Sequence, residues 1–120
     1  MLLNLSNHPS PTWPPEQQQA AAAQFGAGIT DLPFPQIAPE ANEADIEALA
    51  GEYLQKIEAM QPRPAAVHLM GEMTFTFALV RRLQAAGLPC VASTTARDVV
   101  EEGGVKVSKF RFVRFRGYSH

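Results

Sequence analysis

The chain has 120 residues, 46% of them hydrophobic, which suits one domain with a real core and leaves no room for two. Its formal net charge of −2 at pH 7 excludes an overall basic surface and argues against a protein that coats long nucleic acids. One cysteine, Cys90, permits no internal disulfide and favours a reducing compartment. The N-terminal residues include neither a basic stretch nor an apolar run long enough for a signal peptide or a membrane span. We therefore expect a single domain over residues 1–120, cytoplasmic and not attached to a membrane.

Strand and helix patterns alternate along the chain. Short apolar runs bounded by turn residues predict strands, and apolar residues at three- and four-residue steps predict amphipathic helices. Asn42 and Asp45 have the spacing of a capping box, and Gly103-Gly104 is a strong hairpin signal. The expected elements are a strand at Leu2–Ser6, a helix from Pro14 to Phe25, a weak strand at Ile29–Phe34, a helix from Asn42 to Met60, a buried strand at Ala65–Met70, a helix at Thr74–Ala86 with Phe77, Val80 and Leu83 inward, a buried strand at Pro89–Ala92, and a hairpin of Arg97–Glu101 with Val105–Phe115.

This order of elements, three strand–helix units, a fourth strand and a hairpin, predicts the α/β class. Such alternation is typical of a mainly parallel sheet with helices on both faces. Because crossovers between parallel strands are right-handed, a doubly wound Rossmann-like sheet with a C-terminal β-hairpin is the simplest arrangement.

Three polar segments follow predicted strands: Ser6–Trp13, Met70–Thr76 and Ser93–Arg97. In open α/β sheets, ligands bind beyond the carboxyl ends of the strands, where the strand order reverses. We therefore expect these segments to form the functional site.

The first segment offers donors for phosphate, ribose or base edges in Ser6, Asn7, His8 and Ser10. Asn7 and Ser10 equally suit a role in shaping the turn, and turn histidines often satisfy backbone groups. Trp13 can stack on a base or cover the edge of the core.

The second segment leads into a helix N-terminus, where free N–H groups favour an anion. Gly71 lets a ligand approach the backbone. Thr74 and Thr76 can cap the helix or bind phosphate, and Glu72 can accept hydrogen bonds from ribose hydroxyls or adenine amines.

The third segment, Ser93-Thr94-Thr95, ends at Arg97, whose guanidinium suits a phosphate. A surface salt bridge from Arg97 to Asp98 or Glu101 is the equally weighted alternative.

The remaining patterns in the sequence are weaker indications of function. Lys106–Arg116 interleaves basic and aromatic residues, as single-stranded nucleic-acid binders do, but the alternation fits a half-buried antiparallel strand better. His8, His68 and His120 lack metal-ligand spacing, so we expect no metal or other cofactor. His68 and Cys90 are expected to be buried in strands.

Three motifs carry a family resemblance: Leu3-Asn4-Leu5-Ser6-Asn7-His8-Pro9, Val67-His68-Leu69-Met70-Gly71-Glu72 and Ala92-Ser93-Thr94-Thr95-Ala96-Arg97. The chain resembles small stand-alone CRISPR ancillary proteins that are similar to CARF domains, the Rossmann-like sensors of cyclic oligoadenylate in type III antiviral defence. The resemblance implies a homodimer, with a higher assembly left open, that holds cyclic tetra-adenylate across its two-fold axis.

Three functions remain open. The chain can sequester the cyclic oligoadenylate and dampen signalling, which needs only the polar segments. It can be a metal-independent ring nuclease, with His8 and Arg97 as the candidate catalytic residues. It can also be an interaction subunit without a small ligand. We expect sequestration, because no acid–base pair is evident in the sequence.

Overall fold

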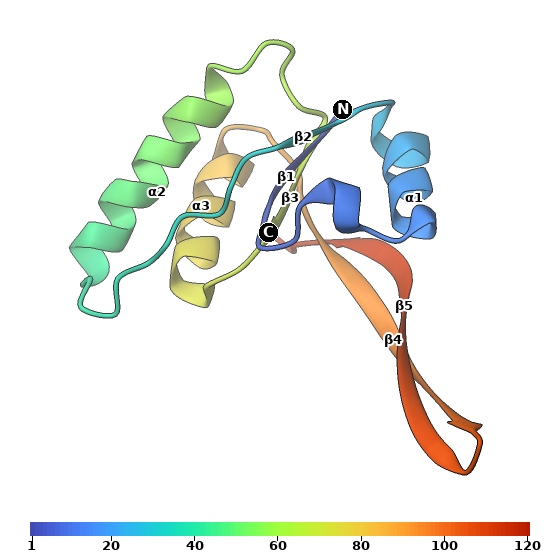
Figure 1. The fold of residues 1–120 in the computed structure, drawn as a ribbon. Coiled ribbons are helices and arrows are strands. Elements are labelled where there is room, and N and C mark those ends of the chain that lie inside the picture. The colour runs from blue at the N-terminus through green and yellow to red at the C-terminus, as the bar shows by residue number, and fades with distance from the viewer.

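The computed structural model describes all residues from Met1 to His120 and has strands, α-helices and one short 3₁₀ turn in alternation (Figure 1). In chain order these are β1 (Leu2–Ser6), the 3₁₀ turn (Ser10–Thr12), α1 (Pro15–Phe25), β2 (Ile29–Asp31), α2 (Glu43–Glu58), β3 (Ala66–Met70), α3 (Met73–Ala85), β4 (Cys90–Glu102) and β5 (Val105–Gly117).

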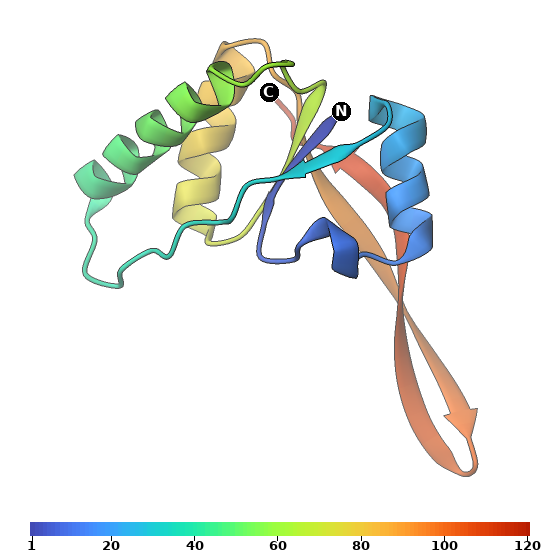
Figure 2. The ribbon, with the colours of Figure 1, turned by 45° about the horizontal axis from the view of Figure 1, so that its top comes forward.

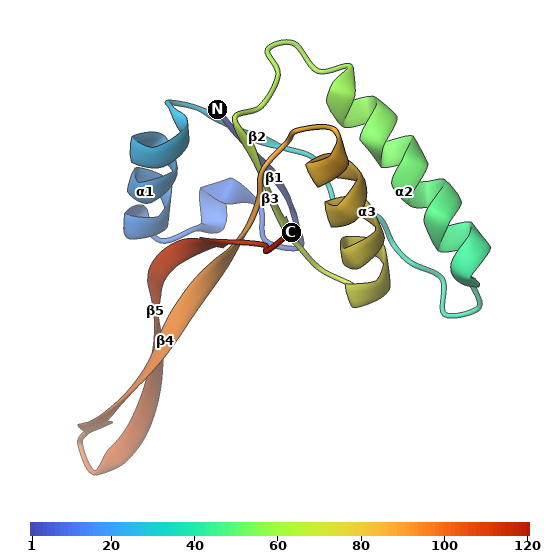
Figure 3. The same ribbon diagram turned by 180° about the vertical axis from the view of Figure 1, so that it is seen from behind.

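The strands form one five-stranded mixed sheet in the order β2-β1-β3-β4-β5. β1 pairs in parallel with β2 and β3, β3 pairs in parallel with β4, and β5 runs antiparallel to β4. Helix α1 covers one face of the sheet, whereas α2 and α3 lie side by side on the other (Figures 1 and 3). The expected α/β class is thus confirmed, with a mixed sheet.

Side chains alternate between two cores, one on each face of the sheet. Leu3, Leu5, Val67 and Leu69 point toward α2 and α3 and belong to a cluster of 14 buried residues. Their sequence neighbours point toward α1, where a smaller cluster contains Leu2, Trp13, Ala66, Val91, Phe112 and Phe115. The polar residues Asn4 and Ser6 of β1 and His68 of β3 therefore all face the α1 side.

Helix α2 begins with the predicted capping box. The Asn42 side chain accepts a hydrogen bond from the backbone N–H of Asp45 at 2.9 Å, and the Asp45 carboxylate accepts one from the Asn42 N–H at 3.0 Å. These two bonds satisfy N–H groups that the first turn of a helix leaves free.

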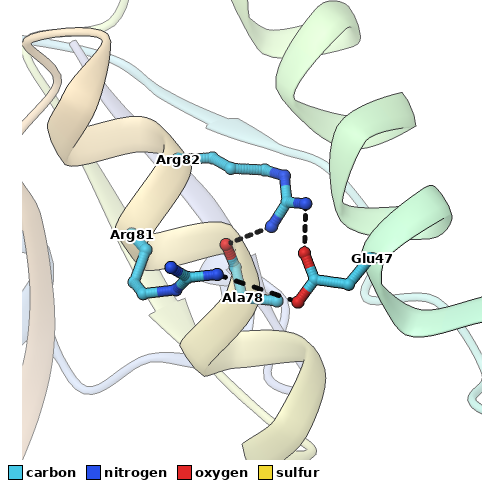
Figure 4. Close-up of polar contacts among 4 residues, drawn as sticks. All are labelled: Glu47, Ala78, Arg81 and Arg82. Carbon is cyan, nitrogen blue, oxygen red and sulfur yellow. Dashed lines mark hydrogen bonds and ion pairs between the residues drawn. The ribbon is translucent and has the colours of Figure 1, made fainter. Parts of the chain in front are cut away.

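Glu47 on α2 joins this helix to α3 (Figure 4). Its carboxylate pairs with the Arg82 guanidinium and lies 3.8 Å from that of Arg81. Arg82 also donates to the carbonyl of Ala78 at 3.0 Å. The hydrogen bond from Arg82, helped by the charges of both arginines, lowers the pKa of Glu47. This ion pair bridges α2 and α3 at the protein surface, on the face of the sheet opposite α1.

Two expectations about the second half of the chain are wrong. Phe77 does not point inward: it is 68% exposed on α3, while Phe75 and Leu79 fill the core in its place. The segment Ser93–Arg97 does not follow a strand but is part of one, because β4 continues without a break from Cys90 to Glu102.

β4 and β5 pair over their whole length and extend well beyond the rest of the molecule (Figure 2). Gly103 and Gly104 close this hairpin with φ of 58° and 80°, the positive values that a tight hairpin turn requires. The hairpin contains six basic and three acidic residues, whereas the remainder of the chain contains four basic and nine acidic residues. Positive charge is therefore concentrated on the hairpin, and the body is acidic.

The helices of the structure are all too short or too polar to cross a membrane.

Candidate functional site

A chain of hydrogen-bonded side chains crosses four adjacent strands on the α1 side of the sheet. Asp31 of β2 accepts from the Asn4 amide of β1 at 2.8 Å, and the Asn4 carbonyl oxygen lies 2.9 Å from Nδ1 of His68 in β3. Nε2 of His68 lies 3.2 Å from the hydroxyl of Ser93 in β4. We call Asp31, Asn4, His68 and Ser93 the polar chain.

Asn4 makes every hydrogen bond that its amide permits. Nδ2 donates to Asp31 and, at 2.9 Å, to the backbone carbonyl of His8. Oδ1 accepts from the Ser6 hydroxyl at 2.8 Å and from His68. Because both partners of Nδ2 are pure acceptors, the orientation of the amide is fixed.

The orientation of Asn4 determines the tautomer of His68. Asn4 Oδ1 can only accept, so Nδ1 of His68 is the nitrogen that carries the proton. Burial, together with the nearby His8 charge, lowers the pKa of His68 from 6.5 to about 4, so the imidazole is neutral at pH 7. Nε2 is then an acceptor, and the Ser93 hydroxyl donates to it.

This direction leaves the lone pairs of Ser93 available to a ligand. The sulfur of Met70 lies 3.2 Å from the same hydroxyl, but a thioether is a weak acceptor and does not compete well with an imidazole nitrogen. Ser93 therefore presents an acceptor, suited to a ribose hydroxyl or an exocyclic amine.

A hollow of about 350 Å³ opens over the His68 and Ser93 end of the polar chain. We call it the strand-end hollow. Its volume lies in the range of small-ligand sites. No lysine or arginine lines it, so His8 and His68 are its ionisable groups. Its lining includes His8, Trp13, His68, Met70, Ser93 and Thr95.

The segment after β1 is shaped by its own polar groups. The carbonyl of His8 accepts hydrogen bonds from Asn4 and, at 3.0 Å, from the indole of Trp13. Ser10 donates twice to Asp31, from its backbone N–H at 3.1 Å and from its hydroxyl at 2.8 Å. Trp13 is buried, with its ring 5.0 Å from that of His68 in an edge contact. It covers the edge of the core and lines one side of the strand-end hollow.

In the segment after β3, the N–H groups at the start of α3 already have hydrogen-bond partners within the chain. The Glu72 carboxylate caps α3 by accepting from the N–H groups of Thr74 at 3.0 Å and Phe75 at 2.9 Å. A hydrogen bond from the Thr74 hydroxyl, followed by those from the two backbone N–H groups, lowers the pKa of Glu72. A Cβ at Gly71 would meet the Phe34 ring at 2.3 Å, so it is Phe34 that uses the space beside this glycine. An anion at this helix N-terminus would have to displace Glu72.

The structure divides the residues expected from the sequence among several places. His8, Trp13, Ser93 and Thr95 meet in the strand-end hollow. Ser6 and Asn7 line a second hollow beside Asp31, and Gly71 and Thr76 line a third, beside α3. The buried Thr76 hydroxyl has no hydrogen-bond partner. Thr94 faces the other side of the sheet, where its hydroxyl donates to the Arg114 carbonyl at 3.1 Å.

Arg97 lies outside the strand-end hollow, on the projecting part of β4. Its Nε and one terminal nitrogen donate to the Ser108 hydroxyl at 3.1 and 3.0 Å. It forms neither of the expected salt bridges, since Asp98 pairs with Arg111 instead.

Asn4, Asp31 and His68 are the site residues that sequence reasoning missed. The available signal was the alternation itself, because Asn4 and His68 are polar residues inside otherwise apolar buried strands.

The buried Cys90 has a pKa raised to about 12 by burial and does not act as a thiolate nucleophile at neutral pH. No group of three His, Cys, Asp or Glu side chains could hold a metal ion.

The fold and the polar chain define an α/β protein with a polar site at the carboxyl ends of parallel strands. The chain belongs to the family described as Uncharacterized protein MJ1673 family, whose model matches residues 1–116. No curated protein and no solved structure matches the chain significantly. The family match includes the whole polar chain and almost all of the hairpin.

Proposed function

We propose that the protein binds a cyclic oligoadenylate second messenger, cyclic tetra-adenylate, and sequesters it, which dampens type III CRISPR signalling. The observation that carries the proposal is the polar chain beneath the strand-end hollow. The polar chain holds Ser93 in place as a preorganised acceptor. The lining of the hollow adds polar groups from His8 and Thr95 and an aromatic side chain, Trp13. Adenine and ribose need such a combination of acceptors, donors and an apolar surface.

The position of the hollow supports the same proposal. From β1 the chain continues to β2 on one side and to β3 and β4 on the other, so the strand order reverses beside β1. Crevices at such reversals are the usual ligand sites of doubly wound sheets. We propose on this basis that the sheet is a Rossmann-like variant of the CARF type.

A homodimer is part of the proposal. A ring of identical adenylates has rotational symmetry, and two copies related by a two-fold axis can present equivalent hollows to it. The hollow has no lysine or arginine of its own. The cations on the hairpins are available to balance the phosphates of a ligand that extends beyond it.

Cleavage of the ring is the second candidate function. The specific observation in its favour is the contact between the neutral imidazole of His68 and the Ser93 hydroxyl, which is a base–hydroxyl pair next to a solvent-accessible hollow. A histidine with a pKa of about 4 is a weak base at pH 7, and this favours sequestration over cleavage.

Titration of cyclic tri-, tetra- and hexa-adenylate into the purified protein, with native gels and chromatography of the ligand, tests both functions. We expect a shift with intact cyclic tetra-adenylate and a complex of two chains by light scattering. Thr95→Ala should weaken binding, whereas Thr94→Ala removes a hydroxyl from the opposite face of the same strand and should not. Linear products would change the function to a ring nuclease. Absence of binding to every ring would refute the proposal.

A further inference from the structure

The two faces of the β4–β5 hairpin have different chemistry. Phe112 and Phe115 point toward α1 and are buried there. Phe110 is two residues before Phe112 on β5, so it points to the same face. It lies past the end of the body, however, and its side chain is 74% exposed. An exposed phenylalanine thus extends an aromatic row that begins in the core.

Arg97 lies directly opposite Phe110 on the same face. The register pairs Thr95 with Phe112 and Arg97 with Phe110, and the one irregularity of the ladder precedes Thr95. Thr95 lines the strand-end hollow. Arg97 and Phe110 therefore occupy the next position outward, about 7 Å along the strands from the Thr95 pair.

Arg97 keeps its charge available. On the opposite face, Arg111 bonds the Asp98 carboxylate at 3.2 Å and Lys109 bonds that of Glu102 at 2.9 Å. Arg97 has only the neutral Ser108 hydroxyl as a partner, and this contact holds the guanidinium against the strand without neutralising it.

We propose that Phe110 and Arg97 form a second nucleotide subsite, which binds the adenylate unit next to the one in the strand-end hollow. The inference rests on the proposed function and adds to it a specific residue for each part of that unit. Phe110 stacks on the base, as exposed aromatic residues do in proteins that bind single strands. Arg97 binds the phosphate that joins the two units. Two units on each chain of a dimer account for the four adenylates of cyclic tetra-adenylate.

The net charge of the hairpin favours this occupant over a second copy of the protein. Six basic and three acidic residues suit a polyanion, whereas two hairpins of the same charge repel each other. A hairpin contact with the acidic body of a second copy would instead bury Phe110, and such a contact would depend on this side chain in the absence of ligand.

The experiment measures the dissociation constant of cyclic tetra-adenylate for matched variants. Phe110→Ala should weaken binding about tenfold to a hundredfold, the usual effect of removing one stacking ring. Phe110→Trp should retain affinity, because the larger ring can still stack. Arg97→Gln should also weaken binding and reduce its salt dependence. The controls Phe77→Ala and Arg111→Gln, an exposed ring on α3 and a cation on the other hairpin face, should change little.

The two proposals fail in different ways. If Thr95→Ala weakens binding but Phe110→Ala and Arg97→Gln do not, the strand-end hollow is the whole site and the second subsite is wrong. If the wild-type protein binds no cyclic oligoadenylate, the proposed function fails and the subsite with it. If Phe110→Ala converts a dimer into a monomer by light scattering without ligand, Phe110 is a contact between copies, and the subsite is again overturned.

Discussion

Asn4 Oδ1 and His68 Nδ1 lie 2.9 Å apart in the interior of the sheet, and this contact sets the tautomer of the imidazole. Through it, an amide on β1 makes Nε2 of His68 the acceptor to which the Ser93 hydroxyl on β4 donates its proton. The chemistry of the strand-end hollow is thus controlled by a residue that does not line it.

Acid should destabilise the protein through His68. In the unfolded chain this histidine has a pKa near 6.5, whereas burial lowers it to about 4 in the fold. The unfolded state therefore binds the extra proton between these values, and the free energy of unfolding falls as the pH drops from about 6.5 to about 4. The two pKa values correspond to roughly 3 kcal/mol in total. Urea denaturation from pH 7.5 to pH 4 measures the slope.

The His68→Gln variant has no imidazole at this position and should lose that part of the slope. His8→Gln is the control on the surface and should retain most of it, because burial is the larger cause of the lowered His68 pKa. An unchanged slope in His68→Gln would mean that another group causes the acid sensitivity.

Replacement of Asn4 by leucine should cost about 3 kcal/mol of unfolding free energy. The side chain is 2% exposed, and its loss leaves His68, Asp31 and the His8 carbonyl without one partner each. Chemical denaturation at pH 7.5 gives the value. Asn7→Ala, at an exposed position in the same segment, should stay within about 0.5 kcal/mol of the wild type. Similar stabilities for the two variants would show that the polar chain contributes little.

Alanine at two glycines should have opposite effects. At Gly71 a Cβ would lie 2.3 Å from the Phe34 ring, so Gly71→Ala should destabilise by about 1–3 kcal/mol. At Gly51, inside α2, no atom lies within 4 Å of the added Cβ, and Gly51→Ala should stabilise by up to about 1 kcal/mol. Thermal denaturation distinguishes the signs. In a Phe34→Ala background the Gly71→Ala penalty should shrink, and a full penalty there would contradict the steric explanation.

Loss of the Glu72 cap should cost about 1 kcal/mol, since the N–H groups of Thr74 and Phe75 would have only water as a partner. The pKa of Glu72 is lowered in the fold, so this stabilisation is present above pH 4.5 and disappears as the pH falls through the lowered value. Denaturation of Glu72→Ala at pH 7 measures the loss. Glu58→Ala, at the end of α2, should have almost no effect, and a comparable cost there would point to a general charge effect.

Local sequence signals predicted the parts of the fold that depend on a few neighbouring residues. Asn42 and Asp45 form a capping box within a single helical turn, and Gly103-Gly104 forms a tight turn between the two strands that it joins. Phe77 was misplaced because its spacing on α3 is compatible with an inward face. Phe75 is buried instead, against Phe34 and against Tyr53 of α2, and these distant contacts are not specified by the local spacing. The length of β4 was underestimated because its polar residues after Ala92 resemble a loop when the pairing with β5 is unknown.

The location of the site was predicted from the sequence, but the hydrogen bonds that connect its residues were not. The rule for strand ends identified Ser93 and the segment after β1 from the order of elements alone. The polar chain depends on register: Asn4 is opposite both Asp31 and His68, and these pairings join residues that are 27 and 64 positions apart. A single sequence does not specify such pairings.

The separation of charge between the hairpin and the body gives the protein an electric dipole. A small anion in solution is drawn toward the basic end of such a molecule before it makes any contact, and is repelled by the acidic helix α2. The association rate of an anionic ligand should therefore fall steeply as salt is added, since the Debye length shortens to about 8 Å at physiological ionic strength. In addition to any contact it makes, the hairpin would steer an anionic ligand electrostatically toward one side of the sheet.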